Sequence, residues 1–179
     1  MRIISGGQTG VDRGALDAAL DTGCDCGGWC PSGRRAEDGP IPARYPVREL
    51  SSNAYRERTL RNVLDSDGTL IIHFGELRGG TRLTRTLCRQ YGRPCLAVEG
   101  GAGQTSAIAQ RIAAFCRRHR IDTLNVAGPR ESQATGATQH ARLLVAAFLA
   151  RLRSEEDSQS SCRAAKFAAQ SGAGSPSTR

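Results

Sequence analysis

Three short segments combine glycines with hydroxyl, amide or charged side chains, each at the end of a predicted strand. They read SGGQTGVD at 5–12, RGGTRLT at 78–84 and NVAGPRES at 125–132. Paired glycines let a backbone approach a ligand closely, and the amides at a helix N-terminus favour an anion such as phosphate. Arginine adds a planar fork that matches phosphate oxygens. The segments therefore predict a site for a phosphorylated small molecule.

The candidate binding residues come from these three segments. Each segment taken alone is equally well explained as a tight turn, and Asp12 as a solvated carboxylate favoured by the helix dipole. Because the carboxyl ends of parallel strands meet at one edge of a sheet, three such segments together favour a ligand site. The candidates are Gly6, Gly7, Gln8, Thr9, Gly10, Asp12, Gly79, Gly80, Thr81, Asn125, Gly128, Arg130, Glu131 and Ser132.

Several common motifs are absent. The glycines after the first strand run GGxxG rather than GxGxxG, and no GxxxxGK[ST] phosphate loop occurs, so NAD and ATP lack their usual sequence support. Cys24, Cys26 and Cys30 do not have the spacing of a zinc site, which favours plain thiols. We therefore expect no metal ligands.

The elements that position these segments follow from the apolar pattern. Strands are predicted at 2–5, 24–28, 69–74, 94–99 and 122–128, and helices begin near 11, 55, 81, 105 and 136. The stretch WCPSGRRAEDGPIPARYPV at 29–47 is predicted as a long loop. This alternation predicts an α/β fold, a Rossmann-like, doubly wound and mainly parallel sheet of about five strands with helices on both faces.

Composition bounds the remaining organisation. We expect a ligand-binding domain over residues 1–152 and a disordered C-terminal tail over 153–179, where large apolar residues become scarce. The apolar runs are too short to span a bilayer and no signal peptide is visible, so we expect a cytoplasmic protein without a membrane partner. The net charge of +8 suits an anionic ligand, whereas aromatic residues at 4% argue against nucleic acid.

Four segments carry a family resemblance. SGGQTGVDRGALDAAL, GGWCPSGRRAEDGPIPARYP, GGTRLT and NVAGPRES resemble, in order and spacing, the putative molybdenum carrier family, which is similar to the molybdenum cofactor carrier proteins. The resemblance covers about residues 2–150. It implies a Rossmann-like sheet, distantly similar to the phosphoribohydrolases that release cytokinin bases. Arg34 and Arg35 of the second segment join the candidate binding residues.

The resemblance also implies a ligand, the molybdenum cofactor (molybdopterin), which is a pterin with a dithiolene and a terminal phosphate. The phosphate would rest on the amides of 6–10 or of 79–81, and the sequence leaves this choice open. Asp12, Asn125 and Glu131 would meet the pterin. Proteins that donate or accept the cofactor are the implied partners, and a homo-oligomer is expected.

One departure bears on catalysis. The related phosphoribohydrolases carry PGGxGTxxE, whose glutamate is catalytic, whereas this chain reads RGGTRLT and lacks that glutamate. We therefore expect a carrier or storage protein that holds the cofactor or a related phosphorylated pterin without catalysis, and assign no catalytic residue. The alternatives are an enzyme acting on a nucleotide or ribosyl phosphate, with Asp12 or Glu131 as acid or base, and a nucleotide-sensing module.

Overall fold

A five-stranded parallel sheet forms the centre of the protein, in a computed structural model that describes residues 1–101 and 105–171. The strand order is β2-β1-β9-β7-β8. The strands are β1 Arg2–Ile4, β2 Asp25–Gly27, β7 Gly68–His73, β8 Cys95–Glu99 and β9 Thr123–Ala127. The apolar run Leu70 to Ile72 is fully buried, as expected for a strand covered on both faces. The predicted Rossmann-like fold is confirmed.

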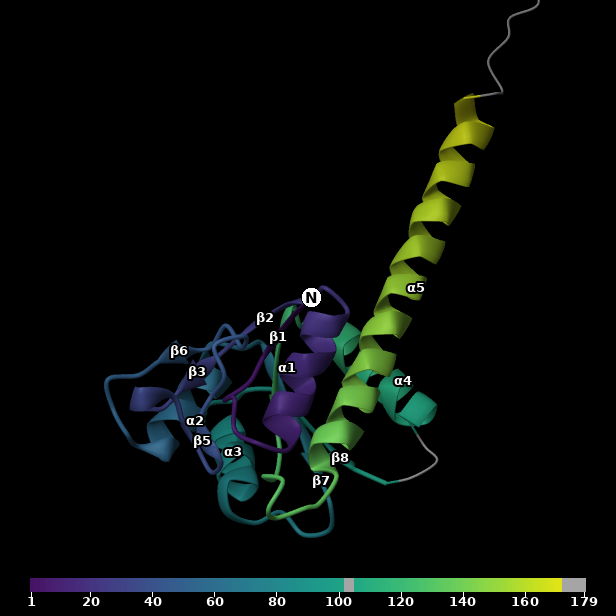
Figure 1. Ribbon diagram of the computed structural model, residues 1–179. Helices are drawn as coiled ribbons and strands as arrows, with labels where there is room; N and C mark the ends of the chain where they lie inside the picture. The colour runs from purple at the N-terminus through teal and green to yellow at the C-terminus, as the bar shows by residue number, and fades with distance from the viewer. Residues whose placement is uncertain (102–104, 172–179) are drawn as a thin grey trace, which may run out of the picture.

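In the part of the chain that the structure describes, five helices cover the two faces of this sheet. They are α1 Val11–Asp21, α2 Tyr55–Leu64, α3 Gly79–Gln90, α4 Thr105–His119 and α5 Ala137–Ser171. Helices α1, α4 and α5 pack together over the larger core, whereas α2 and α3 pack together over a smaller one built on Val63, Leu87 and Cys88 (Figure 1). Neighbouring strands β9 and β7 are thus followed by helices on opposite faces. A doubly wound sheet leaves a crevice at such a point.

Residues 28–50, predicted as a loop, form a compact segment with short strands. Here β3 Trp29–Cys30 pairs with β6 Arg48–Glu49, β4 Arg35–Ala36 pairs with β5 Gly39–Pro40, and η1 spans Ser32–Arg34. The Arg34 guanidinium donates hydrogen bonds to the carbonyls of Ile41, Pro42, Tyr45 and Val47. One side chain therefore fixes a segment whose prolines and glycines suggested irregular structure.

Helix α5 is longer than predicted. Residues 153–171, expected to be part of a disordered tail, continue the helix to Ser171, and Figure 1 shows it extending well beyond the other elements. The stretch 137–171 contains no glycine or proline, and Arg153 donates a hydrogen bond to the carbonyl of Thr22. The expected boundary at residue 152 is thus not a break in the helix. Residues 172–179 lie outside the described residues.

Among the residues that the structure describes, no helix is both long and apolar enough to cross a membrane.

Candidate functional site

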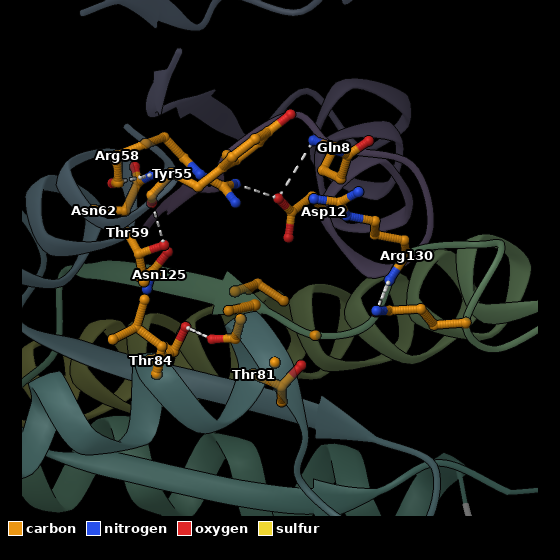
Figure 2. Close-up of a pocket in the computed structure, with 18 residues that line it drawn as sticks. Gln8, Asp12, Tyr55, Arg58, Thr59, Asn62, Thr81, Thr84, Asn125 and Arg130 are labelled. Carbon is orange, nitrogen blue, oxygen red and sulfur yellow. Dashed lines mark hydrogen bonds and ion pairs between the residues drawn. The ribbon is translucent and has the colours of Figure 1, made fainter. Parts of the chain in front are cut away.

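A cavity of about 380 Å³ lies at the carboxyl end of the sheet, where the loops after β1, β9 and β7 converge. The side chains that line it are shown in Figure 2. The lining includes part of each glycine-containing segment: Gly6, Gln8 and Asp12 from the first, Gly79, Gly80 and Thr81 from the second, and Asn125, Gly128 and Arg130 from the third. Segments that are far apart in sequence therefore meet at one place.

Helix α3 presents its N-terminus to this cavity. The amides of Thr81 and Arg82 donate to the carbonyl of Arg78, at 3.1 and 3.2 Å, whereas the amides of Gly79 and Gly80 have no acceptor among the described residues. No side chain caps the helix. A Cβ at Gly80 would meet nothing within 4 Å, so the backbone there is open. Two free amides at the positive end of a helix dipole form a suitable seat for an anion.

In the first glycine segment three amides have protein partners, whereas those of Gly6 and Gly7 have no acceptor among the described residues. The amide of Gln8 donates to Asp12 Oδ2 at 3.3 Å, that of Thr9 to Gln8 Oε1 at 3.0 Å, and that of Gly10 to Thr138 Oγ1 at 3.1 Å. Gly7 and Gly10 have positive φ, and a Cβ at Gly10 would lie 2.4 Å from the carbonyl oxygen of Pro129. Gly7, Thr9 and Gly10 are not among the residues that line the cavity. Gly10 instead lets this loop approach the loop at Pro129 closely.

Asp12 is a buried carboxylate on the cavity wall. Its Oδ2 lies 2.9 Å from Arg58 Nη1, and the two side chains are only 7% and 15% exposed (Figure 2). Burial raises the pKa of Asp12 above its ordinary value, and the Arg58 guanidinium opposes this shift. The guanidinium can occupy its position because Gly6 has no side chain: a Cβ there would lie 1.5 Å from Arg58 Nη1.

Gln8 places an unused hydrogen-bond donor on the same wall. Its Oε1 accepts from the amides of Thr9 and Glu37, which fixes the orientation of the side-chain amide. Its Nε2 has no partner among the described residues, and it is buried, since the residue as a whole is only 5% exposed. A buried donor without an acceptor is costly. Because this atom has almost no exposed surface, the Gln8 side chain would have to turn to donate to a ligand in the cavity.

Glu131 and Ser132, two further candidates, contact the protein instead of the cavity. The Glu131 carboxylate accepts hydrogen bonds from the Thr138 hydroxyl at 2.7 Å and the Thr138 amide at 2.9 Å. These bonds lower the pKa of Glu131 and cap the start of α5. Ser132 donates its amide and hydroxyl to Glu37, which also accepts from the Thr9 hydroxyl. Glu37 thus ties the first segment to the third.

The two arginines proposed from the second segment also lie elsewhere. Arg34 is committed to the four carbonyls described above, and Arg35 is exposed in the short strand β4. Neither lines the cavity.

Helix α2 supplies a wall that the sequence analysis missed. Tyr55, Arg58, Thr59 and Asn62 line the cavity and face Asp12 and Arg130 across it (Figure 2). Tyr55 is 40% exposed, and the centroid of its ring lies 5.3 and 5.9 Å from the guanidinium carbons of Arg130 and Arg58. The four α2 residues that line the cavity are spaced i, i+3, i+4 and i+7. This spacing marks one polar face of a helix, which the sequence could have revealed. The remaining lining residues are Leu83, Thr84, Val126, Ala127 and Gln133.

Within the described part of the chain, no three His, Cys, Asp or Glu side chains are grouped so that they could hold a metal ion. The cavity therefore offers hydrogen-bond donors, hydroxyls, a helix N-terminus and one paired carboxylate. This chemistry suits an anionic organic molecule with a polar ring.

Comparison with known proteins gives two matches. The model of the circularly permutated YpsA SLOG family matches residues 3–149. A crystal structure described as that of a putative molybdenum carrier protein from Syntrophus aciditrophicus SB is 44% identical in sequence, with a TM-score of 0.80. That match covers 83% of this chain and 94% of the other. Among curated proteins, none matches the chain.

Proposed function

Because the chain belongs to the circularly permutated YpsA SLOG family, and is similar to a protein described as a molybdenum carrier, we propose that it is a carrier. Its cargo in this proposal is the molybdenum cofactor or a related phosphorylated pterin, held in the cavity between α2 and α3. The observation that carries the proposal is the pair of free amides at Gly79 and Gly80.

The residues present fit such a cargo. The phosphate would rest on the amides of Gly79 and Gly80 and the hydroxyl of Thr81. A pterin ring has donors and acceptors along its edge, and Gln8 and Asp12 on the cavity wall carry an amide and a carboxylate that suit them. The exposed ring of Tyr55 provides an aromatic surface at the same cavity.

The direct test is purification from a host that makes the cofactor, followed by assays of bound pterin and molybdenum. We expect the purified protein to contain both pterin and molybdenum, in equal molar amounts. If the purified protein contains neither and takes up none from a cofactor-loaded donor protein, the proposal fails.

A substitution at α3 separates binding from folding. Gly80→Asp places a carboxylate where the phosphate would rest, in open space. Because an acidic residue stabilises a helix N-terminus by about 0.3–1 kcal/mol, the variant should fold at least as well as the parent while losing its cargo. Gly101→Asp is the matched control, since Gly101 is exposed, a Cβ there would meet no atom within 4 Å, and the residue lies outside the cavity. Equal cargo in both variants would contradict the assigned site.

The raised pKa of Asp12 favours a second candidate, an enzyme acting on a nucleotide or ribosyl phosphate. A carboxyl whose pKa is raised can exchange a proton closer to neutral pH than an ordinary aspartate. The Arg58 ion pair counts against this role, because it favours the ionised form. To test this second candidate, the protein is incubated with a panel of nucleoside monophosphates and the products are separated by chromatography. Turnover that disappears in Asp12→Asn would establish the enzyme.

A further inference from the structure

A second cavity, of about 560 Å³, adjoins the first at the N-terminus of α3. Thr81 and Gln133 line both cavities. Gly79 and Gly80 face the first cavity, whereas Arg78, the residue directly before them, lines the second. The anion seat therefore lies at the junction of two hollows rather than at the closed end of one.

The second cavity has the character of a site for a ring. The Phe74 side chain lines it and is held in place by edge-to-face contact with His140, their centroids being 5.3 Å apart. Arg78 pairs with Glu76 at 2.9 Å, yet both side chains are more than 80% exposed. An ion pair this exposed contributes little, so Arg78 can turn toward an anion beside the helix terminus.

We infer that the cargo of this site carries its phosphate in the middle: a diphosphate with one ring system in each cavity, which is the dinucleotide class. This inference rests on the proposed function, since the same α3 terminus holds the phosphate. The amides of Gly79 and Gly80 bind one phosphate of the pair, and Arg78 binds the other. The first cavity takes the pterin-like ring and the second takes the nucleoside.

The test compares flavin mononucleotide with flavin adenine dinucleotide by isothermal titration calorimetry, since their flavin ring resembles a pterin and only the second extends beyond its phosphate. We expect the dinucleotide to bind at least about tenfold more tightly. Ala134→Phe, which fills the second cavity, should reduce that ratio to about twofold or less and leave mononucleotide affinity unchanged. Ala114→Phe, on the exposed face of α4, is the matched control.

Glu76→Gln is the second variant, and it tests the same inference without crowding the core. It removes the negative charge beside the second cavity and frees Arg78, so the affinity for the dinucleotide should rise and that for the mononucleotide should not. Glu76 is exposed, so its substitution should not disturb folding. The inference can therefore still be tested with Glu76→Gln if Ala134→Phe does not fold. A ratio that neither variant changes overturns the inference.

The outcomes separate this inference from the function on which it rests. If both flavins bind the parent protein equally well, the second cavity is not a ligand subsite and the phosphate-anchored carrier remains. If neither flavin binds at millimolar concentration, this inference fails, and the carrier proposal is decided separately by the assay of bound pterin and molybdenum.

Discussion

Replacing Gly6 by alanine should act entirely through Arg58. A Cβ at residue 6 would lie 1.5 Å from Arg58 Nη1 and 2.9 Å from its Cδ, so the guanidinium must leave its present position. The backbone of Gly6 does not have a positive φ, and alanine is therefore not strained there. The displaced guanidinium no longer pairs with Asp12, which stays buried.

The expected loss of unfolding free energy follows from leaving the Asp12 carboxylate buried without its ion-pair partner. Removing one partner of a buried ion pair costs about 3–5 kcal/mol, and the partial exposure of Arg58 to the cavity reduces this to about 2–4 kcal/mol. Asp12 can also take up a proton. Protonation limits the loss, because burial already raises the pKa of Asp12 above its ordinary value.

The sign of the pH dependence follows from the direction of the pKa shift. Because the pKa of Asp12 is raised in the folded state, ionising it costs stability as the pH rises above the ordinary value of 3.8. Without Arg58 the pKa rises further, so the difference between parent and variant should grow from pH 4 toward pH 7.

A double-mutant cycle measures this. Urea unfolding of the parent, Gly6→Ala, Arg58→Ala and the double variant at pH 7 and pH 5 gives the four free energies of unfolding. The double variant should be no less stable than Arg58→Ala, since the methyl group added at residue 6 then fills vacated space. Additive losses would refute the reasoning, because they would mean that Gly6 contributes independently of Arg58.

Three further predictions concern groups outside the cavity. Glu131→Ala should cost about 1–2 kcal/mol of unfolding free energy through loss of the α5 cap, with no change in flavin affinity by calorimetry; a lost affinity would place Glu131 in the site. Arg34→Met should cost about 2–4 kcal/mol in urea unfolding, because four carbonyls lose a charged donor; a loss below about 0.5 kcal/mol would show the clamp to be unimportant. Burial lowers the pKa of His140, so stability should be complete above its ordinary value of 6.5 and fall below it. His140→Leu should flatten that part of the curve of melting temperature against pH, and an unchanged slope would exclude His140 as its source.

The fold could be predicted because each central element has a simple sequence pattern. The run TLIIHF predicted a strand covered on both faces, and the structure buries Leu70, Ile71 and Ile72 completely. The segment 28–50 could not be predicted, since its order depends on Arg34 reaching carbonyls 7 to 13 residues away. Likewise, the helix over 153–171 depends on backbone propensity rather than on the apolar residues that the sequence analysis weighed.

The candidate site was predictable in part for a similar reason. The rule that loops after parallel strands converge brought Asp12, Gly80 and Arg130 to one cavity. It could not supply α2, because Tyr55 and Arg58 lie on a helix that packs against α3 and β3 and not in a loop after a strand of the sheet. Nor could it reveal Glu37, whose contacts with Thr9 and Ser132 join distant segments.

The choice between the two glycine pairs depends on whether their free amides begin a helix, which glycine content alone does not reveal. In the segment 6–10 the amides of Gln8, Thr9 and Gly10 are taken by Asp12, Gln8 and Thr138. The amides of Gly6 and Gly7 have no acceptor among the described residues, but they do not begin a helix. The pair at 79–80 begins a helix whose first two amides have no acceptor among the described residues. In our proposal the anion binds at 79–80, where the free amides lie at the positive end of a helix dipole, while Thr9 and Gly10 join the first loop to other segments. An anion that protected the amide of Gly7 from hydrogen exchange, and not that of Gly80, would reverse this assignment.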